Sequence, residues 1–447
     1  MTNLNLDFRG VIQNYKEVEL ISSSFKIESE SIVILDLDSN LDIVFYYSLC
    51  LNSNCTIIFI LLNNSNLISN IDSFKPNYII TNNEYDLDEN WIKDIHKENF
   101  IYFNLHNKKN PFQQVLLSTS GSTGSQKFVR LTKENIYFNA KSIVQSLNIR
   151  STDVTITNLP LHYSFGLSVL NSHLLVGAKV IVTNYSIVQK EFWNLVKDHK
   201  VTNFFGVPYT FEILDKIRFL KMDLPHLRLI AQAGGKMNIK LQDKYLEYCD
   251  EKGIEYFTMY GQTEATARMS YLPYQFANQK KGSIGIPIPS GRFELRNETG
   301  QKIEGINSVG ELVYFGPNVS LGYATCYNDL LKEDENKGML FTGDLAKRDD
   351  DGFYYIVGRK NRFLKLFGNR ISLQEIEEQL ESKGIEAVCG GQDDKLITYT
   401  TNKNEVDQIR KWLSEFTKIH LSAFEVKFIE KIPRNESGKI LYSKLFL

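Results

Sequence analysis

The sequence predicts an α/β fold, with parallel sheets flanked by helices and a smaller α+β part at the C-terminal end. Three observations support this prediction. Short apolar runs alternate with longer mixed stretches through the first hundred residues, the texture changes to short strands and turns from about Gly282, and a helical pattern follows Gly358. Buried strands that alternate with helical stretches are typical of a parallel sheet.

The apolar runs of the first part are expected to be buried strands. They are "SIVILDL", "TIIFILL" and "NYIITN" in the first hundred residues, then "TNFFGVP", "LRLIAQAGG" and "IEYFTMYG". The last three end in glycine or proline followed by polar residues. Strands of an open α/β sheet end in this way where their carboxyl ends face a ligand crevice, so we expect a binding site at that edge.

The region after Gly282 is expected to contain short strands, a hairpin and a helix. "GELVYFGP" and "KRDDDGFYYIVGR" are strand-like, and "DDDG" is a hairpin turn signal. In "SLQEIEEQLESKG", the residues Leu373, Ile376 and Leu380 fit one face of a helix. Ser372 is the candidate cap of that helix.

Two domains are predicted, a large one of residues 1–360 and a small α+β domain of residues 361–447. The chain of 447 residues is long enough for two or three hydrophobic cores. Its 43% hydrophobic and 23% charged residues are ordinary for a globular protein. The net charge of -2 argues against a nucleic-acid-binding or membrane-surface protein, because those functions need a basic excess.

The cysteines and the N-terminus favour a cytoplasmic protein. Five scattered cysteines, odd in number and without a CxxC pair, indicate free thiols in a reducing compartment. The N-terminal "MTNLNLDFRGVIQ" lacks the basic start and apolar stretch of a signal peptide. The apolar runs are too short to span a bilayer, and the histidines show no metal-ligand spacing, which argues against a structural zinc site.

One polar segment, "QVLLSTSGSTGSQKFVRLT", has the composition of an anion-binding loop. Serine, threonine and glycine fill every position from Ser118 to Gly124, and Lys127 follows. Glycines let the backbone turn its amides inward and the hydroxyls add donors, so a polyphosphate is the expected ligand. The spacing differs from a Walker A loop, in which lysine directly follows glycine. A plain surface loop is the alternative interpretation.

The stretch "LLSTSGSTGSQK" resembles the phosphate loop of the adenylate-forming (AMP-binding) superfamily, which includes acyl- and aryl-CoA synthetases, adenylation domains and luciferases. Three further stretches match motifs of this family in the same order: "YGQTEATARMS", "LFTGDLAKRDDDGFYYIVGR" and "PRNESGKILYSKL". "GSIGIPIPS" and "GELVYFGPNVSLGY" also fit between them. The first hundred residues carry no motif and are assigned to the family by continuity.

The resemblance refines the expected fold. It implies a large N-terminal domain of α/β subdomains with a small β-barrel-like subdomain, and a small mobile α+β C-terminal domain. In the family, the C-terminal domain rotates about a hinge after adenylation. The hinge falls at Asn361 in "GRKNRFLK", a position that is normally acidic or lysine, so the electrostatic control of the rotation is open.

The implied reaction joins a carboxylate to the α-phosphate of ATP, expels pyrophosphate, and then forms a thioester on CoA or on a carrier-protein pantetheine. Because one anion attacks another, donors and a metal ion must offset repulsion in the transition state. The loop residues implied to bind the nucleotide are Thr119, Ser120, Gly121, Ser122, Thr123, Gly124 and Lys127. Of these, Ser120, Ser122, Thr123 and Lys127 would hold the β- and γ-phosphates.

The motif "YGQTE" is implied to surround the α-phosphate and the base. Thr263 would donate to the α-phosphate, and Glu264 would coordinate Mg²⁺, which prefers carboxylate and phosphate oxygens. Tyr260 would stack on adenine next to Gly261. Two alternatives stay open, because Tyr260 also fits a core residue and Glu264 also fits a carboxylate at a helix N-terminus.

The remaining nucleotide contacts are implied by three further motifs. The turn Gly234–Gly235 in "AQAGGKM" would line the base with backbone. Asp344 would accept hydrogen bonds from the ribose hydroxyls, and Arg359 would reach the same ribose. The alternative for Asp344 is a residue that only closes a turn after Gly343.

Lys439, in the C-terminal motif, is implied to be the central catalytic residue. Its ammonium would sit between the attacking carboxylate and the α-phosphate and would stabilise the charge that develops there. Because Lys439 lies on the small domain, rotation of that domain would withdraw it after adenylation. A solvated loop lysine is the alternative interpretation.

The acyl pocket is implied to be lined by "LPLHYSFGL", with His162, Tyr163, Phe165 and Gly166 as candidate residues. Here tyrosine and histidine exchange the positions that the family often uses, and a plain packing role for both stays open. No carboxylate is present in "LHYSFGLSVL" to pair with an α-ammonium group. We therefore favour an acyl or aryl acid without an α-amino group, since a buried ammonium without a partner is costly.

Several further residues have more than one interpretation. Arg268 is interpreted either as a contact to a polar substrate group or as a surface residue. Lys360, Arg362 and Lys365 are candidates for the 3′-phosphate of CoA or for a solvated face, and a pantetheine arm would pass Gly368. Gln126 replaces the usual proline of the phosphate loop, and Phe128 is a candidate brace beneath it. Amino-acid adenylation and a non-catalytic nucleotide-binding homologue are the alternative functions, whereas a kinase or NTPase loop is absent from the sequence.

Overall fold

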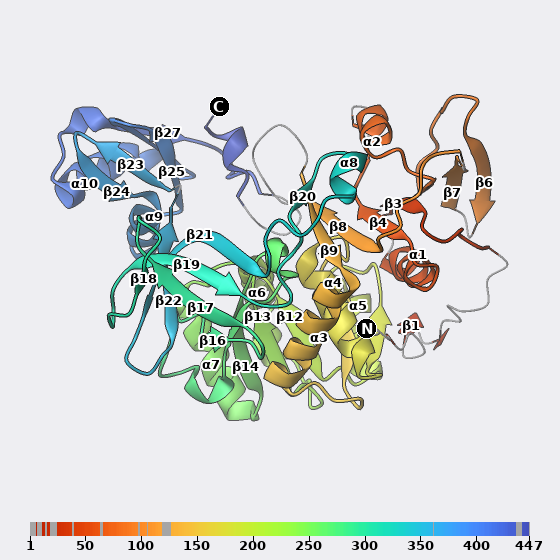
Figure 1. Cartoon of the computed structure of the whole chain (residues 1–447). Helices are drawn as coiled ribbons and strands as arrows, with labels where there is room; N and C mark the ends of the chain where they lie inside the picture. Colours follow the sequence, from red (N-terminus) through yellow and green to blue (C-terminus); the bar gives the residue numbers. More distant parts are fainter. Residues whose placement is uncertain are drawn as a thin grey trace. The chain divides into compact units, whose positions relative to one another are not determined.

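The computed structural model describes residues 6, 11–13, 16–17, 25–37, 40–62, 66–96, 99–104, 106–118, 127–360, 362–434 and 440–446. The chain forms two compact units, Met1–Phe293 with Tyr314–Leu340, and Glu294–Val313 with Phe341–Leu447 (Figure 1). This division places residues 341–360 with the C-terminal part, and the boundary predicted between residues 360 and 361 stays a prediction. In the described residues, no helix is long and apolar enough to cross a bilayer.

The first unit contains an eight-stranded sheet in the order β20-β9-β8-β4-β3-β5-β7-β6. Its bounds are β3 Ile32–Asp36, β4 Thr56–Phe59, β5 Tyr78–Thr81, β6 Ile92–His96, β7 Asn99–Phe103, β8 Gln114–Ser118, β9 Phe128–Thr132 and β20 Tyr323–Ala324. The central strands β8, β4, β3 and β5 are parallel, and the outer strands pair antiparallel. Almost every residue of the central strands is buried, which explains their continuous apolar runs.

The second sheet of this unit has nine strands in the order β16-β15-β14-β13-β12-β10-β11-β1-β2. Its bounds are β1 Val11–Gln13, β2 Lys16–Glu17, β10 Val154–Ile156, β11 Lys179–Val182, β12 Asn203–Gly206, β13 Leu229–Gln232, β14 Glu255–Tyr260, β15 Ser270–Leu272 and β16 Ile286–Pro287. Strands β10 to β14 pair in parallel. All the apolar runs quoted above form strands, so the predicted α/β class is confirmed for this part.

Helices of the first unit connect and cover these sheets (Figure 1). They are α1 Asn40–Asn52, α2 Leu67–Phe74, α3 Lys133–Leu147, α4 Ser164–Leu175, α5 Lys190–Asp198, α6 Pro208–Lys216, α7 Ile239–Lys252 and α8 Tyr327–Leu330. One core cluster contains Ile57 of β4, Leu170 of α4 and Val180 of β11. Helix α4 therefore packs against both sheets, and this is why it is apolar around most of its circumference.

The second unit begins with a five-stranded sheet in the order β18-β17-β19-β21-β22. Its bounds are β17 Arg292–Arg296, β18 Lys302–Ile303, β19 Gly310–Phe315, β21 Met339–Arg348 and β22 Tyr354–Arg359. The predicted hairpin is confirmed: β21 and β22 pair antiparallel, and the N–H of Gly352 donates to the carbonyl of Asp349 at 3.2 Å in the turn between them.

The rest of the second unit is α+β. It contains the hairpin of β23 Phe363–Leu366 and β24 Asn369–Ser372, the helices α9 Leu373–Ser382 and α10 Val406–Thr417, and the sheet of β25 Ala387–Gln392, β26 Lys395–Thr400 and β27 Phe424–Phe428. The predicted helix is confirmed as α9: Ser372 caps it by accepting from the N–H of Glu375 at 3.2 Å. Leu373, Ile376 and Leu380 are buried in the core of this part, as predicted.

Candidate active site

The turn after strand β14 carries the "YGQTE" motif at the carboxyl edge of the nine-stranded sheet. Tyr260 ends the strand, and its ring lies 6.5 Å from that of Phe293. A Cβ atom at Gly261 would lie 1.7 Å from the carbonyl oxygen of Ala267, so only glycine allows the chain to fold back this closely. The motif glycine is thus required by the backbone of the turn itself.

Thr263 is held next to the first turn of helix α4. Its Oγ1 shares a hydrogen bond of 3.1 Å with the Oγ of Ser164, the first residue of α4. Two motifs that lie about a hundred residues apart in the sequence are therefore brought together. Sequence analysis missed Ser164, although it stands directly after the two aromatic residues of "LPLHYSFGL".

Glu264 lies in a short 3₁₀ helix, Thr263–Ala265, and its Oε1 accepts a hydrogen bond of 2.8 Å from the hydroxyl of Tyr323. Burial, reinforced by the neighbouring Glu264 carboxylate, raises the pKa of Tyr323, which keeps it a donor. Within the described residues, the other oxygen of Glu264 has no hydrogen-bond donor. A half-exposed carboxylate with a free oxygen fits a Mg²⁺ ligand, and a 3₁₀ helix of three residues does not support the alternative helix-terminus role.

Asn318 locks this turn in place. Its Nδ2 donates to the carbonyls of Ala265 and Arg268 at 2.7 and 2.9 Å, and its backbone carbonyl accepts from the hydroxyl of Thr266 at 2.6 Å. Asn318 belongs to "GPNVSLGY", which contains Tyr323 as well. One stretch of sequence thus supplies both the support of the turn and the partner of Glu264.

Gly234 and Gly235 follow strand β13 at the same edge of the sheet. Gly234 has a φ of 85°, and a Cβ there would also meet the side chain of Val207 at 3.1 Å. The carbonyl of Gly235 accepts from Nε2 of Gln232 at 2.6 Å. The glycines therefore form a fixed backbone turn, as a base-lining segment requires.

Asp344 and Arg359 are paired within the second unit. They face each other across β21 and β22, and the Nε of Arg359 donates to Oδ1 of Asp344 at 3.0 Å. The Asp344 side chain is 4% exposed, whereas that of Arg359 is 62% exposed. Because Asp344 lies inside a strand, the alternative that it only closes a turn is wrong.

The phosphate loop, the hinge and the catalytic lysine fall outside the described residues. These predicted residues are Thr119, Ser120, Gly121, Ser122, Thr123, Gly124, Asn361 and Lys439. Lys127 is described, and it is exposed directly before β9. Phe128 is fully buried and packs edge-on against Phe74 at 5.3 Å, as a core residue of the eight-stranded sheet.

The four predicted acyl-pocket residues surround the start of α4. The rings of His162 and Tyr163 are 4.4 Å apart, and Phe165 packs against Phe205. A Cβ at Gly166 would lie 2.3 Å from the carbonyl oxygen of Pro160, so glycine permits the tight entry into the helix. A packing role and a pocket role both fit this arrangement.

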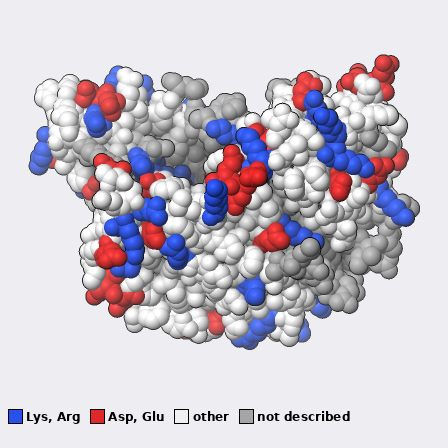
Figure 2. All heavy atoms as spheres, viewed as in Figure 1, with Lys and Arg blue, Asp and Glu red and all other residues white. Residues whose placement is uncertain are grey.

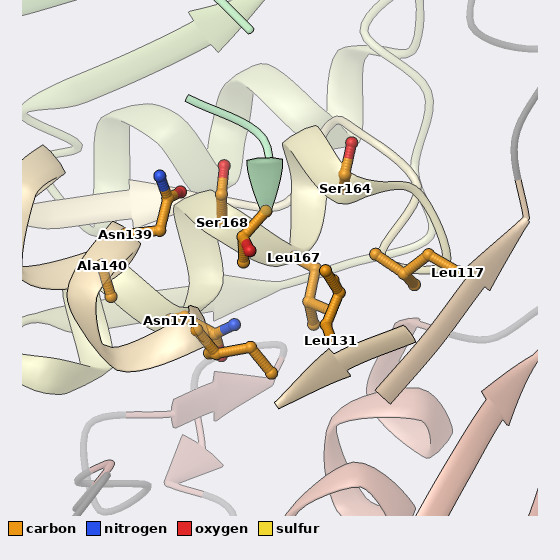
Figure 3. Close-up of a pocket in the computed structure, with 10 residues that line it drawn as sticks. Leu117, Leu131, Asn139, Ala140, Ser164, Leu167, Ser168 and Asn171 are labelled. Carbon is orange, nitrogen blue, oxygen red and sulfur yellow. The ribbon is translucent and has the colours of Figure 1, made fainter. Parts of the chain in front are cut away.

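A small cavity lies between α3, α4, β8 and β9 (Figure 3). Half of the residues that line it are apolar, and the polar members are Ser164, Ser168, Asn139, Asn171 and Thr266. None of the four predicted acyl-pocket residues lines it, although Ser164 connects it to Thr263. The cavity is thus adjacent to the motif turn, the turn after β14 that carries "YGQTE".

Arg268 is buried, with 4% of its surface exposed, so the interpretation as a surface residue is wrong. Its guanidinium carbon lies 3.8 Å from the centre of the Phe165 ring. This contact joins the motif turn to the predicted acyl pocket, because Phe165 follows Ser164 in α4.

The candidate CoA-binding residues differ in how far their side chains are engaged by other residues. Arg362 is engaged inside the second unit, where it donates to Glu377 at 2.7 Å and to the carbonyl of Cys389 at 3.0 Å. Lys360 pairs with Glu311 at 2.8 Å, and Lys365 is exposed. Arg362 is therefore neither a solvated residue nor an available phosphate ligand.

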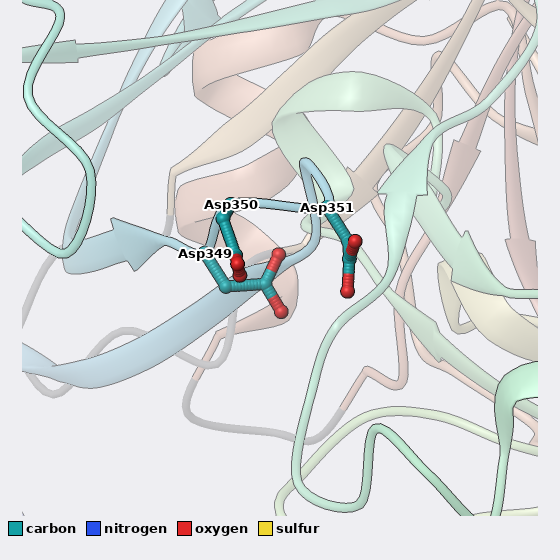
Figure 4. A group of neighbouring side chains, drawn as sticks. All are labelled: Asp349, Asp350 and Asp351. Carbon is teal, nitrogen blue, oxygen red and sulfur yellow. The ribbon is translucent and has the colours of Figure 1, made fainter.

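Charges of both signs are mixed on the face of the molecule that Figure 2 shows. On the face seen in Figure 2, lysine and arginine side chains are interspersed with aspartate and glutamate. Asp349, Asp350 and Asp351 cluster on the β21–β22 turn (Figure 4). Asp349 stabilises this turn, since its Oδ1 accepts from the N–H of Phe353 at 2.8 Å.

The sequence is similar to a family of AMP-binding enzymes and to two CoA ligases. The family model described as AMP-binding enzyme matches residues 53–324. The 2-succinylbenzoate–CoA ligase of Bacillus licheniformis is 30% identical over 344 residues, 74% of this chain and 69% of that protein. The long-chain-fatty-acid–CoA ligase of Yersinia pestis is 30% identical over 350 residues, 73% of this chain and 60% of that protein.

Solved structures agree over nearly the whole chain. The O-succinylbenzoate coenzyme A synthetase of Bacillus subtilis in complex with AMP matches with a TM-score of 0.78 and 22% identity, covering 98% of this chain and 95% of that one. The same enzyme with ATP and a magnesium ion matches with a TM-score of 0.76 and 23% identity, covering 98% and 96%. The mixed α/β fold with several sheets is therefore shared.

Proposed function

Because the chain belongs to the AMP-binding enzyme family, we propose that it uses ATP and Mg²⁺ to activate a small carboxylic acid and transfers the acyl group to a thiol. It is an adenylate-forming ligase of the acid–thiol type. In the first step, a carboxylate oxygen bonds to the α-phosphorus and the bond to the β-phosphate oxygen breaks, which releases pyrophosphate. In the second, the thiolate sulfur bonds to the acyl carbon and AMP leaves with the electron pair of the carbon–oxygen bond.

The observation that carries the proposal is the pair of neighbouring residues Thr263 and Glu264. The hydroxyl of Thr263 meets that of Ser164, and the carboxylate of Glu264 keeps one oxygen available while Tyr323 holds the other. A donor for the α-phosphate thus lies beside a ligand for Mg²⁺. The metal would offset negative charge on the phosphate oxygens when it is bound.

The other nucleotide contacts are proposed from the same motifs. Asp344 would accept from the ribose hydroxyls, and Arg359 would hold its carboxylate in orientation. Tyr260, Gly261 and the turn Gly234–Gly235 would surround adenine. The phosphate loop from Thr119 to Gly124 and Lys127 would bind the β- and γ-phosphates.

The finer domain organisation is part of the proposal. Residues 1–360 would form a large domain with α/β subdomains and a β-barrel-like subdomain, and residues 361–447 a mobile lid. Asn361 would be the hinge, and Lys439 would approach the α-phosphate in one arrangement of the lid. The free state of all five cysteines supports the proposed reducing, cytoplasmic setting.

We propose CoA as the thiol acceptor, because the curated relatives reported above are named CoA ligases. Lys365 is the exposed candidate for the 3′-phosphate. A carrier-protein pantetheine that passes Gly368 is the alternative. The acid would lack an α-amino group, because helix α4 and the loop before it supply no carboxylate.

The test is acid-dependent exchange of pyrophosphate into ATP, followed by identification of the acyl-adenylate by mass spectrometry. A panel of aryl, acyl and amino acids is supplied, and Lys439→Ala serves as the matched variant. We expect exchange with at least one acid in the native protein and almost none in the variant. Binding of ATP without exchange for any acid would instead favour a non-catalytic homologue, and exchange with amino acids alone would favour amino-acid adenylation.

A further inference from the structure

Arg268 is directed into the protein by an unusual backbone. The two residues before it, Thr266 and Ala267, both have positive φ angles, of 59° and 104°. Non-glycine residues rarely adopt such angles, and runs of them persist only where surrounding contacts impose them. Here Asn139 and Asn318 impose the turn, since the Nδ2 of each donates to the carbonyl of Arg268, at 2.8 and 2.9 Å.

The guanidinium reaches helix α4, and no counter-charge meets it among the described residues. Its Nη1 donates to the carbonyl of Ala267 at 3.2 Å, and its face stacks on Phe165. The Nη2 atom is buried and has no acceptor in the described part of the chain. An arginine carries five N–H donors, so most of its hydrogen-bonding capacity has no acceptor in the parts of the chain that the structure describes.

Two further arginines, the fully buried Arg130 and the partly buried Arg362, have acidic partners. Arg130 is fully buried and is neutralised by Glu335 at 2.9 Å and by three backbone carbonyls. Arg362 pairs with Glu377. Among the described residues, no carboxylate pairs with Arg268. A buried cation without a partner is costly, and burial lowers the pKa of Arg268 only to about 9, so it stays charged at neutral pH.

We propose that Arg268 is a specificity-determining residue that binds a second carboxylate of the substrate, and that the enzyme activates compact dicarboxylic acids. This inference rests on the proposed function and narrows its substrate class. The geometry supports it because Phe165, which stacks on Arg268, follows Ser164, which contacts Thr263. One carboxylate would approach Thr263 and the nucleotide while the other meets the Nη2 donor.

The competing explanation is a purely structural arginine, and matched acids separate the two. Exchange of pyrophosphate into ATP is measured for dicarboxylic acids and for analogues in which one carboxylate is replaced by a methyl group. Arg268→Met removes the charge at similar length, and Arg268→Lys keeps it. Arg292→Met is the control, because Arg292 also stacks on an aromatic ring, at 3.7 Å from Phe315, but is exposed.

We expect the native enzyme to prefer the dicarboxylate by about a hundredfold or more in kcat/KM. Arg268→Met should lose about a hundredfold with the dicarboxylate, keep its kcat/KM for the analogue and its KM for ATP, and Arg268→Lys should recover part of the loss. Equal losses with both acids, or a native preference for the analogue, would overturn the proposal. The control variant should keep the native preference.

A second measurement does not depend on turnover. Without ATP, a dicarboxylate at high concentration should raise the Tm of the native protein and leave that of Arg268→Met unchanged, and the unliganded variant should be at least as stable as the native protein. If no acid supports exchange, the proposed function fails, and this shift still tests Arg268. If Arg268→Met does not fold, the acid preference of Arg268→Lys is measured instead. The proposal fails if Arg268→Lys keeps the native acid preference and the dicarboxylate shifts the Tm of both proteins equally.

Discussion

At the scale of single residues, each of the proposed catalytic or nucleotide-binding groups is held by a neighbouring side chain. Glu264 is held by Tyr323, and Thr263 by Ser164. Asp344 is held by Arg359 in the same way. Ser164 has a short side chain at the start of a helix, and Tyr323 and Arg359 lie on strands. Because these partners are placed by regular structure, they hold the proposed reactive groups with little loss of conformational freedom.

The Glu264–Tyr323 pair predicts how activity depends on Mg²⁺. Tyr323→Phe should weaken the apparent affinity for Mg²⁺ by about tenfold, because partners of metal ligands typically contribute that much. Glu264→Gln should have a larger effect, since it removes the charge of the ligand itself. Pyrophosphate exchange measured over a Mg²⁺ titration provides the test, and identical titration curves for native and Tyr323→Phe proteins would contradict it.

His173, buried within α4, predicts a loss of stability in acid. Its Nδ1 lies 2.8 Å from the carbonyl of Val169 and its Nε2 lies 3.1 Å from Nδ2 of Asn203. The neutral ring satisfies both contacts by donating from Nδ1 and accepting at Nε2. Burial lowers the pKa of His173 to about 4, against an ordinary value of 6.5, while Asp153 and Arg228 act in opposite directions.

The sign of the effect follows from this depressed pKa. Below pH 6.5 the unfolded chain takes up a proton that the folded protein refuses, so stability falls towards pH 4 by up to about 1.4 kcal/mol per pH unit and is unaffected by this group above pH 6.5. Urea unfolding at pH 7 and pH 5 measures it. His173→Gln should reduce the difference between the two pH values, whereas His106→Gln, at an exposed position, should not.

At the scale of elements, helix ends decide where motifs begin. Gly166 lets α4 start against the Pro160 turn, which places Ser164 beside Thr263. Ser372 similarly starts α9, whose buried face completes the core of the C-terminal part. Local sequence signals therefore determine where the side chains of the candidate site and of the core of the C-terminal part lie.

The cap of α9 gives a prediction at this scale. Ser372→Ala should destabilise the helix by about 1 kcal/mol, because the N–H of Glu375 loses its acceptor. Hydrogen exchange of the α9 amides in the native protein should become about fivefold faster. Ser382→Ala is the control, since Ser382 is exposed at the other end of the helix and donates only to the carbonyl of Gln379. Equal protection in native and Ser372→Ala proteins would contradict the cap assignment.

At the scale of the whole molecule, the two half-reactions are proposed to need two arrangements of the C-terminal domain. In the second unit, Arg362 follows the proposed hinge and stacks on Tyr442 at 4.3 Å, three residues after Lys439. The segment after the lysine is therefore anchored to the residue after the hinge. Rotation about the proposed hinge would therefore move Arg362 and the segment after Lys439 together.

A substitution at the hinge should separate the half-reactions. Asn361→Pro fixes φ near -65° and removes an N–H, which restricts rotation there. We expect pyrophosphate exchange to stay within about threefold of native, while thioester formation falls by about tenfold or more because the second arrangement is disfavoured. Asn369→Ala is a control within the same part of the chain. A parallel loss of both half-reactions would contradict the hinge assignment.

The amino-acid sequence alone was sufficient to predict the strands of the parallel sheets, the β21–β22 hairpin and the capped helix α9, and to identify the family motifs. These features depend on residues close together in the chain, where hydrophobic periodicity, turn residues and caps act directly. The same local logic explains Gly261, which the turn itself requires.

The contacts between distant segments of the candidate site could be identified only from the tertiary structure. Ser164 meets Thr263, Tyr323 meets Glu264, and Arg268 lies buried against Phe165 instead of on the surface. Each of these contacts joins segments that are separated by 59 to 103 positions in the sequence. Which side chains meet across such separations is set by how sheets and helices pack, and no local pattern carries that information.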